Sequence, residues 1–408
     1  MRQTLTFWAV VTVLCAMFAL GQESPAPSYR FSSDSATVNI PFKEVANGLI
    51  FVRAQVNGHP GWFILDNAAQ GFTVDRSFAH QIALVSGEHA LARTDGPNTI
   101  QATIAHDIRI SLPNLNLTHR NAVVIDLKIL EPSVGHEVDG IIGSRLFDDF
   151  VVSIDYEARR LSIYAPSHFR PPEAVEALPV RIDQHGFQFI DVTISLPGVS
   201  PISASFLIDA GANMFADIYK PFADAHQLPP PPVKLLDEPG TGAGGTTQSQ
   251  DGRADQMRIG SYFVKNPPIT FAQETEGLIA AKDHAGLIGA EFLRRFTVIF
   301  DNPGKRLWLV PNRRYGEPAE YDQSGLRLQA DGSGFHRFVV KRIVPQSPAA
   351  EAGIKVGDII ESIDGRPAQE LTLTMVRDMF RTPSAQCTLE LLRGKSQVRL
   401  TMRSRSLL

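Results

Sequence analysis

Residues 63–69 read Phe-Ile-Leu-Asp-Asn-Ala-Ala, and residues 206–212 read Phe-Leu-Ile-Asp-Ala-Gly-Ala. Each stretch is an apolar run that ends in a single aspartate, Asp66 in the first and Asp209 in the second, followed by small residues. A short apolar run bounded by turn-forming residues predicts a buried β-strand. The chain therefore carries two strands of the same design, each of which ends in one carboxyl group.

A second pair of motifs repeats in the same order. Gly-Ile-Ile-Gly at residues 140–143 returns as Gly-Leu-Ile-Gly at residues 286–289, an offset of 146 positions (286 − 140). The two aspartates are 143 positions apart (209 − 66). An offset kept this closely over the length of a lobe indicates internal duplication. Duplication can bring two carboxyl groups together on a pseudo-twofold axis.

Composition narrows the class of protein. The chain has 408 residues, of which 43% are apolar and 20% charged, which is typical of a globular protein with two or three domains. The formal net charge of −4 does not favour a nucleic-acid partner. The histidines are scattered and no Cys-x-x-Cys or His-Glu-x-x-His occurs, so we expect no metal and no cofactor.

The first 21 residues have the features of a signal peptide. Arg2 precedes an apolar stretch at residues 7–20, and Ala-Leu-Gly at 19–21 supplies the small residues of a cleavage site. We expect export, to the periplasm or the medium, without a membrane span after cleavage; an uncleaved anchor is the alternative. Removal of this segment would leave Cys387 as the only cysteine, which excludes a disulfide within the mature chain.

The pattern from residue 38 to residue 311 predicts a mostly β region. Short apolar runs are broken by glycine, proline and asparagine, and few stretches keep a helical period for three turns. A segment at 240–245 formally matches G-x-G-x-x-G, but it lacks the strand and helix that flank a phosphate-binding loop. We expect it to form a mobile loop over a cleft. The predicted divisions are a signal peptide (1–21), a leader (22–37), a first lobe (38–165), a Pro-rich linker (166–178) and a second lobe (179–311).

Two aspartates that meet at such strand ends acquire a chemistry that neither has alone. At a separation of about 3 Å and an effective dielectric of about 20, two carboxylates repel each other by roughly 5 kcal/mol. That repulsion corresponds to about four pKa units. Such a pair holds one proton and titrates as a unit. Its ionised member can take a proton from water while its protonated member donates to a peptide carbonyl.

These motifs resemble those of the retropepsin-like (gag-polyprotein-like) aspartyl protease family, in its bacterial two-lobe form. The resemblance covers residues 38–311 and implies two pseudo-symmetric β-barrel lobes that bind a polypeptide between them beneath a flap. It also implies that Asp66 and Asp209 form the catalytic dyad. The residues that would support this dyad are Asn67, Ala68, Ala210, Gly211, Ile142, Gly143, Ile288 and Gly289.

The two motifs depart from the Asp-Thr-Gly-Ala pattern of that family. Asn67 and Ala68 replace the threonine and the glycine in the first motif, and Ala210 replaces the threonine in the second. The family's threonines form hydrogen bonds across the lobe interface. Asn67 can still donate and accept, whereas Ala210 can do neither, and each lost bond costs about 0.5–1.5 kcal/mol. Ala68 costs about 1–2 kcal/mol only if its turn is left-handed.

The last part of the chain has a different design. Ser-Pro-Ala-Ala at 347–350 predicts a short helix with serine at its N-cap, which Gly353 ends. Asp-Gly at 364–365 is typical of a hairpin turn. Together with Val-Gly-Asp-Ile at 356–359, this order resembles a PDZ domain, a small β-barrel with two helices, over residues 324–404.

A PDZ domain binds the C-terminus of a peptide as an added β-strand and holds its carboxylate with backbone N–H groups. The resemblance implies this role for Ser324, Gly325, Leu326 and Arg327, which occupy the position of the carboxylate-binding loop. Arg327 stands where the family usually has a second glycine. We therefore expect peptide C-termini as partners of this module.

The combined expectation is an exported aspartic endopeptidase with a polypeptide substrate. Because both lobes belong to one chain, the dyad does not require dimerisation and we expect a monomer. Two alternatives stay open. One is a catalytically degenerate pseudo-protease that binds peptides in the cell envelope, and the other is a structural scaffold whose aspartates only cap turns.

Overall fold

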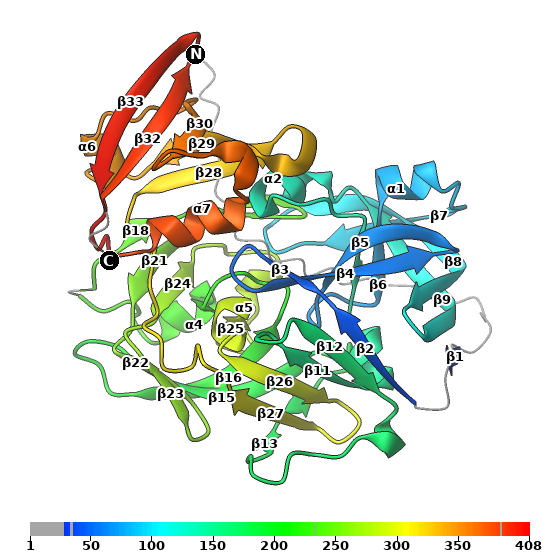
Figure 1. The fold of residues 1–408 in the computed structure, drawn as a ribbon. Helices are drawn as coiled ribbons and strands as arrows, with labels where there is room; N and C mark the ends of the chain where they lie inside the picture. Colours follow the sequence, from blue (N-terminus) through cyan, green and yellow to red (C-terminus); the bar gives the residue numbers. More distant parts are fainter. Residues whose placement is uncertain (1–27, 33–35, 232, 384–385) are drawn as a thin grey trace.

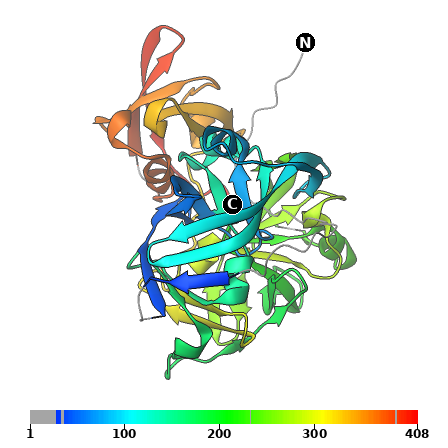
Figure 2. The same ribbon diagram turned by 90° about the vertical axis from the view of Figure 1, so that its right-hand side faces the viewer.

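The computed structural model describes residues 28–32, 36–231, 233–383 and 386–408. Figures 1 and 2 show two β-rich lobes, blue to cyan and green to yellow, with the C-terminal module (orange to red) packed against them. Strands dominate all three parts, which confirms the predicted mostly β class. The predicted signal peptide lies outside the described residues, and no helix within them is long and apolar enough to cross a membrane.

The first lobe is a closed β-sheet. Its strands follow the order β1-β9-β6-β10-β5-β4-β8-β7, and β3 pairs with β4. Because β8 also pairs with β9, the sheet closes into a barrel. β1 lies within the segment predicted as a leader, yet it pairs with β9 of the barrel. The bounds are β1 Ser28–Phe31, β3 Lys43–Val45, β4 Leu49–Val56, β5 His59–Leu65, β6 Phe72–Asp75, α1 Arg76–Gln81, β7 Glu88–Arg93, β8 Thr99–Leu112, β9 Leu115–Ile125, η1 Lys128–Leu130, α2 Glu131–Val134, β10 Gly140–Ile142 and α3 Arg145–Asp149.

The second lobe repeats this arrangement. Its sheet runs β18-β21-β24-β17-β25-β16-β15-β22-β23, with β14 on β15. The path β24-β17-β25-β16-β15 corresponds strand for strand to β9-β6-β10-β5-β4 of the first lobe, with the same parallel or antiparallel sense at each step. The bounds are β14 Arg181–Ile182, β15 Gln188–Ser195, β16 Ile202–Asp209, β17 Ala216–Ile218, α4 Lys220–Ala225, β18 Leu236–Asp237, β19 Gly240–Gly242, β20 Gly245–Thr247, β21 Ser249–Arg253, β22 Gln256–Ile259, β23 Tyr262–Lys265, β24 Pro268–Ala272, η3 Leu278–Ala280, β25 Gly286–Gly289 and α5 Ala290–Leu293.

A six-stranded sheet of order β13-β27-β26-β11-β12-β2 joins the two lobes. At its centre β11 runs antiparallel to β26, and Ser153 lies opposite Ile299. These two residues are equivalent in the repeat, since 299 − 153 is again 146. The pseudo-twofold axis therefore passes between them. The bounds are β2 Thr37–Pro41, β11 Val151–Asp155, β12 Arg160–Tyr164, η2 Pro166–His168, β13 Leu178–Pro179, β26 Phe296–Asp301 and β27 Arg306–Pro311.

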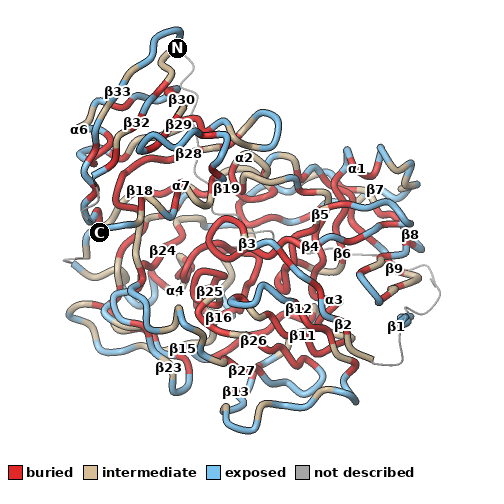
Figure 3. Tube along the Cα trace, viewed as in Figure 1, coloured by how far each residue is buried: buried red, intermediate tan, exposed pale blue. Residues whose placement is uncertain are grey.

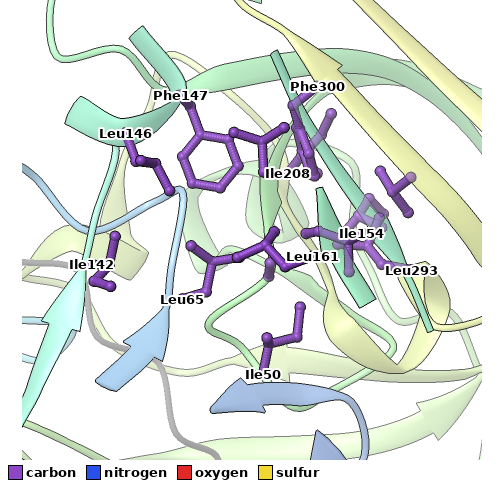
Figure 4. Packing of buried hydrophobic residues seen from close by; sticks show 14 of the residues in the cluster. Ile50, Leu65, Ile142, Leu146, Phe147, Ile154, Leu161, Ile208, Leu293 and Phe300 are labelled. Atoms are coloured by element: carbon purple, nitrogen blue, oxygen red, sulfur yellow. The ribbon is translucent and has the colours of Figure 1, made fainter. Parts of the chain in front are cut away.

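Buried apolar side chains form a continuous cluster that draws on both lobes (Figure 4), and buried stretches of the chain run through the interior of both (Figure 3). Leu65 and Ile208, the residues directly before the two aspartates, both belong to it. Phe147 of the first lobe packs edge-on against Phe300 of the second, with ring centroids 5.2 Å apart. Each aspartate therefore extends from a strand whose preceding residue is fixed in the shared core.

The C-terminal module is a separate sheet of order β28-β29-β30-β32-β33, with β31 on β30 and a core cluster of its own. As the sequence predicts, Ser347 accepts a hydrogen bond from the N–H of Ala350 at the start of α6. Asp364 and Gly365 both adopt positive φ in the turn between β30 and β31. The bounds are β28 Leu326–Asp331, η4 Ser333–Phe335, β29 Arg337–Ile343, α6 Pro348–Glu351, β30 Ile359–Ile363, β31 Arg366–Pro367, η5 Ala368–Glu370, α7 Leu373–Phe380, β32 Gln386–Arg393 and β33 Ser396–Arg403.

The last glycine of each Gly-x-x-Gly motif is required because no side chain fits there. A Cβ atom placed on Gly143 would lie 2.3 Å from the carbonyl oxygens of Ala69 and Gly71. A Cβ atom on Gly289 would lie 2.3 Å from the carbonyl oxygen of Met214. In both lobes the turn that follows the aspartate passes directly over this glycine. The repeated glycine therefore fixes the height of that turn above the supporting strand.

We expect Gly289→Ala to lower the free energy of unfolding by at least about 2 kcal/mol, because the new methyl group overlaps backbone atoms that cannot move freely. Urea-induced unfolding followed by circular dichroism measures this change. Gly316→Ala is the matched control, since a Cβ atom at Gly316 meets no atom within 4 Å. A similar loss of stability in both variants would contradict the steric explanation.

Candidate active site

Each aspartate stands at the end of a strand that the Gly-x-x-Gly segment supports from the side. In the first lobe β5 runs parallel to β10, with Leu65 opposite Ile142. In the second lobe β16 runs parallel to β25, with Asp209 opposite Gly289. The backbone N–H of Asp66 donates to the carbonyl of Ile142 at 3.0 Å. Four of the eight predicted supporting residues lie in these two segments, namely Ile142, Gly143, Ile288 and Gly289.

The two carboxyl groups meet across the lobe interface. A Cβ atom on Gly211 would lie 2.2 Å from Cγ of Asp66, so the first-lobe carboxyl group touches the second-lobe turn. The two carboxyl groups lie close enough that each shifts the pKa of the other. Neither aspartate has any exposed surface. The folding of two distant strands thus brings Asp66 and Asp209 into one buried pair.

The two oxygen atoms of each carboxyl group have different surroundings. Oδ1 of Asp66 accepts hydrogen bonds from the N–H groups of Ala68 at 2.9 Å and Ala69 at 3.0 Å. Oδ1 of Asp209 accepts one from the N–H of Gly211 at 2.8 Å. Oδ2 of each aspartate is buried and has no N–H or O–H donor among the described residues. A hydrogen bond between the two groups therefore needs a proton that one of them carries.

The surroundings shift both carboxyl groups toward their protonated forms. Burial and the nearby charge of Asp209 raise the pKa of Asp66 well above its usual value, and the charge of Asp95 adds to this shift. Burial raises the pKa of Asp209 to about 7, although hydrogen bonds from Gly211, Ala212 and Asp66 oppose the shift. The pair therefore retains a proton at neutral pH.

Asn67 links the two lobes behind the dyad. Its Oδ1 accepts a hydrogen bond from the backbone N–H of Ala210 at 2.8 Å, and its Nδ2 donates to the carbonyl of Ile208 at 2.6 Å. These two backbone groups flank Asp209 on either side. One asparagine side chain therefore donates and accepts across the interface, and Ala210 takes part only through its backbone.

Ala68 fits the first turn without strain. It is not among the residues with positive φ, so the left-handed conformation that would favour glycine does not occur here. Its N–H donates to Asp66, and its side chain is buried in an apolar cluster with Phe187, Leu207 and Ala212 of the second lobe. The replacement of glycine by alanine at this position therefore adds apolar contact between the lobes.

Two hairpins, one from each lobe, meet beside the dyad. The β7–β8 hairpin turns at residues 94–98, and the β19–β20 hairpin turns at residues 243–244. A Cβ atom on Gly244 would lie 2.0 Å from Oγ1 of Thr94, and Asn98 donates to the carbonyl of Gly244 at 3.5 Å. The Gly-rich segment, expected as a mobile loop, thus forms a paired hairpin that packs on the other lobe. Asp95 in the first of these turns lies close enough to the dyad for its charge to raise the pKa of Asp66.

Comparison with known families agrees with this geometry. The model of the aspartyl protease family matches residues 52–146 and 191–292, which include Asp66 and Asp209 respectively. The model of the PDZ domain matches residues 339–393. The chain contains an aspartyl protease domain in two parts and a C-terminal PDZ domain. Both resemblances seen in the sequence are therefore confirmed.

Two similarities to individual proteins are shorter. The chloroplastic C-terminal processing peptidase of Tetradesmus obliquus is 31% identical over 93 residues, which are 22% of this chain and 20% of the relative. The solved structure of the photosystem II D1 C-terminal processing protease is 26% identical over 21% of this chain and 23% of that chain, with a TM-score of 0.20. The chain spans about a fifth of the length of the curated relative that it matches.

The expected carboxylate-binding loop of the PDZ domain is not open to solvent in this structure. Ser324, Gly325, Leu326 and Arg327 are all buried. The N–H of Gly325 donates to Asp322 at 2.7 Å, and the N–H of Leu326 donates to the hydroxyl of Ser324 at 2.9 Å. These donors are occupied from within the loop. A peptide C-terminus therefore cannot bind there unless the loop is first uncovered.

Two polar residues that no sequence motif indicated support the dyad from the second lobe. Nδ2 of Asn67 donates to Oε1 of Gln188, and Nε2 of Gln188 donates to Oδ1 of Asn302. Asn302 in turn donates to the carbonyl of Gly186 at 3.2 Å. All three side chains are buried. This chain of hydrogen bonds holds the amide of Asn67 in the orientation in which its oxygen accepts from the N–H of Ala210.

We expect Asn67→Ala to lower the free energy of unfolding by about 1–3 kcal/mol, because it leaves buried backbone groups of the second lobe without partners. Urea-induced unfolding measures the loss. The double variant Asn67→Thr with Ala210→Thr installs the threonines of the family and should recover most of it. Wild-type stability in Asn67→Ala would show that the lobes are held together elsewhere.

Stability should fall as the pH rises from 5 to 8. Both dyad carboxyl groups have a raised pKa in the folded protein, so the folded state binds more protons than the unfolded state between the unfolded pKa and the folded one. Each pH unit in this window costs up to about 1.4 kcal/mol per group. The thermal unfolding midpoint, measured at several pH values, reports this dependence.

Asp209→Asn should make this pH dependence shallower, and Asp191→Asn, an exposed aspartate of β15, should leave it unchanged. Part of the slope will remain in Asp209→Asn because burial also raises the pKa of Asp251 to about 7 and that of Asp217 well above its usual value. An identical slope in Asp209→Asn and the wild type would show that the dyad does not titrate in this range.

Proposed function

We propose that the chain is an aspartic-type endopeptidase in which Asp66 and Asp209 share one proton and activate a water molecule. The observation that carries this proposal is the close approach of two buried carboxyl groups at the lobe interface, where the Asp66 carboxyl group touches the turn that follows Asp209. Two carboxyl groups held this close cannot both ionise, so one acts as a base and the other as an acid. This combination is what hydrolysis of a peptide bond needs.

The surroundings of the four carboxyl oxygen atoms indicate which of them take part in hydrolysis. Both Oδ1 atoms are engaged by backbone N–H groups, which fixes the orientation of each carboxyl group. The two Oδ2 atoms are left for chemistry. In the reactive state the ionised Oδ2 removes a proton from water, and the resulting hydroxide attacks the peptide carbonyl carbon. The protonated carboxyl group donates a hydrogen bond to the carbonyl oxygen, where negative charge develops.

The polypeptide would bind between the lobes, beneath the tips of the two hairpins. Apolar side chains of the second lobe line the neighbourhood of the dyad, among them Met214, Tyr219 and Ile279. An extended peptide presents alternate side chains to such surfaces, which supports a preference for apolar residues near the cleaved bond. No metal or cofactor takes part in this proposal.

A second candidate is peptide binding without hydrolysis, as in a pseudo-protease of the cell envelope. The observation that favours it is the complete burial of both aspartates. The two candidates share a substrate class and differ only in whether water reaches the dyad. Cleavage assays therefore separate them.

Export is a further part of the proposal, and it rests on the sequence of residues 1–21 alone. Cys387 lies buried in the PDZ domain, and burial raises the pKa of its thiol to about 11. A thiol of this kind is a poor nucleophile and stays reduced in an oxidising compartment. Cell fractionation and N-terminal sequencing of the mature chain test the prediction.

The decisive experiment is incubation of the purified chain with a fluorogenic peptide library between pH 3 and pH 8. We expect cleavage in the wild type and a loss of kcat of at least about a thousandfold in Asp66→Asn and in Asp209→Asn, since each removes one partner of the acid–base pair. Asp191→Asn should cleave like the wild type. Binding of the peptides without cleavage at any pH would favour the pseudo-protease.

A further inference from the structure

The PDZ domain is docked on both lobes of the protease at once. At the start of α7, Thr374 accepts a hydrogen bond from the backbone N–H of Ala46 in the first lobe at 3.0 Å. At its end, Arg381 pairs with Glu291 of α5 in the second lobe at 2.6 Å. Glu291 follows the Gly-x-x-Gly segment that supports Asp209 by two residues. The helix therefore bridges the two lobes (Figure 1).

The edge at which a PDZ domain adds a peptide strand is covered by the first lobe. β28 is an edge strand of the PDZ sheet, and it follows the carboxylate-binding loop. Helix α2 packs along it, and Gln329 of β28 donates to Ser133 of α2 at 3.5 Å. A Cβ atom on Gly135, just after α2, would lie 2.8 Å from Cβ of Leu373 and 3.6 Å from Cβ of Ala330. A segment of the first lobe therefore lies where a peptide would pass between β28 and α7.

The carboxylate-binding loop is engaged by the second lobe. Arg327, the residue that replaces the second glycine, forms two hydrogen bonds to Glu238, from Nε at 2.7 Å and from Nη2 at 2.9 Å. Arg342 of β29 adds a third contact to the same carboxylate at 2.8 Å. The side chains of Arg327 and Glu238 are almost completely buried. The arginine thus holds an internal carboxylate in the loop that, in a PDZ domain, holds the carboxylate of a ligand.

Glu238 lies at the base of the β19–β20 hairpin. Its N–H donates to the carbonyl of Ser249 at 2.8 Å, and the hydroxyl of Ser249 donates back to its carbonyl. β19 begins two residues later, at Gly240. The tip of this hairpin meets the first-lobe hairpin at Thr94, the neighbour of Asp95, whose charge acts on Asp66 of the dyad. The pair of Arg327 and Glu238 therefore fixes the base of the element that closes the site.

We propose that the PDZ domain is a latch on the β19–β20 hairpin, and that a peptide with a free C-terminal carboxylate releases it by competing with Glu238 for Arg327. The α-carboxylate of a peptide and the side chain of Glu238 are chemically equivalent partners for a guanidinium group. The same peptide needs the β28 edge that α2 covers, so its binding displaces the domain from both lobes. Control of hairpin closure by this latch does not depend on the proposed function. Control of hydrolysis by the same latch rests on the peptidase activity proposed above.

The test follows amide hydrogen exchange of residues 239–248 by mass spectrometry in the full chain. We expect Glu238→Gln to accelerate exchange in these residues at least about tenfold, because the hairpin base loses its charged anchor. Arg342→Gln, which removes only a partly exposed contact to Glu238, should act in the same direction with a smaller effect and without unfolding the chain. Glu351→Gln is the matched control, since it breaks an exposed pair with Arg405 within the PDZ domain.

The ligand is tested with a mixture of hexapeptides that carry a free C-terminal carboxylate and varied last three residues, and with the same mixture amidated at the C-terminus. Only the free carboxylates should accelerate exchange in the hairpin and raise kcat/KM for a fluorogenic substrate severalfold. Unchanged exchange in both Glu238→Gln and Arg342→Gln, or an equal response to the amidated mixture, would overturn the latch. Faster exchange in a chain that never cleaves any peptide supports the latch and refutes only the proposed peptidase function.

Discussion

The structure depends on the contact between two strand-end turns across a pseudo-twofold axis. The carboxyl group of Asp66 occupies the space that a side chain on Gly211 would need. Contact at this range removes both carboxyl groups from water, which disfavours their charged forms and leaves a proton on the pair. This close contact explains the residues around each aspartate. The apolar residues before the aspartates and the glycines beside them let the two backbones approach without side chains between them.

The duplication is symmetric in its backbone and asymmetric in its side chains. Corresponding strands pair in the same sense in both lobes, and the joining sheet places Ser153 opposite its own equivalent, Ile299. Across the interface, however, Asn67 serves as both donor and acceptor, and Ala210 contributes only backbone groups. An amide side chain carries both functions on separate atoms. One asparagine can therefore replace two hydroxyl groups, provided that Gln188 holds it in place.

Burial of charge is handled in two different ways within the same molecule. A retained proton reduces the negative charge of the dyad, whereas the guanidinium groups of Arg327 and Arg342 balance the charge of Glu238. A buried ionic partner that is lost costs about 3–5 kcal/mol. Such a pair therefore favours the one docking geometry of the PDZ domain in which both partners meet. The geometry selected here covers β28, the edge at which a PDZ domain adds a peptide strand, and places the domain against both lobes.

The amino-acid sequence by itself determined the mostly β class, the two lobes, the PDZ domain and the equivalence of Asp66 with Asp209. These features follow from short apolar runs, glycine positions and a nearly constant offset, all of which can be read along the chain. Only the tertiary structure decided that the loop from Ser324 to Arg327 is closed, and that Gln188 supports Asn67 from 121 positions away. A buried polar contact is fixed by which surfaces pack together, and such a choice leaves no local pattern in the sequence.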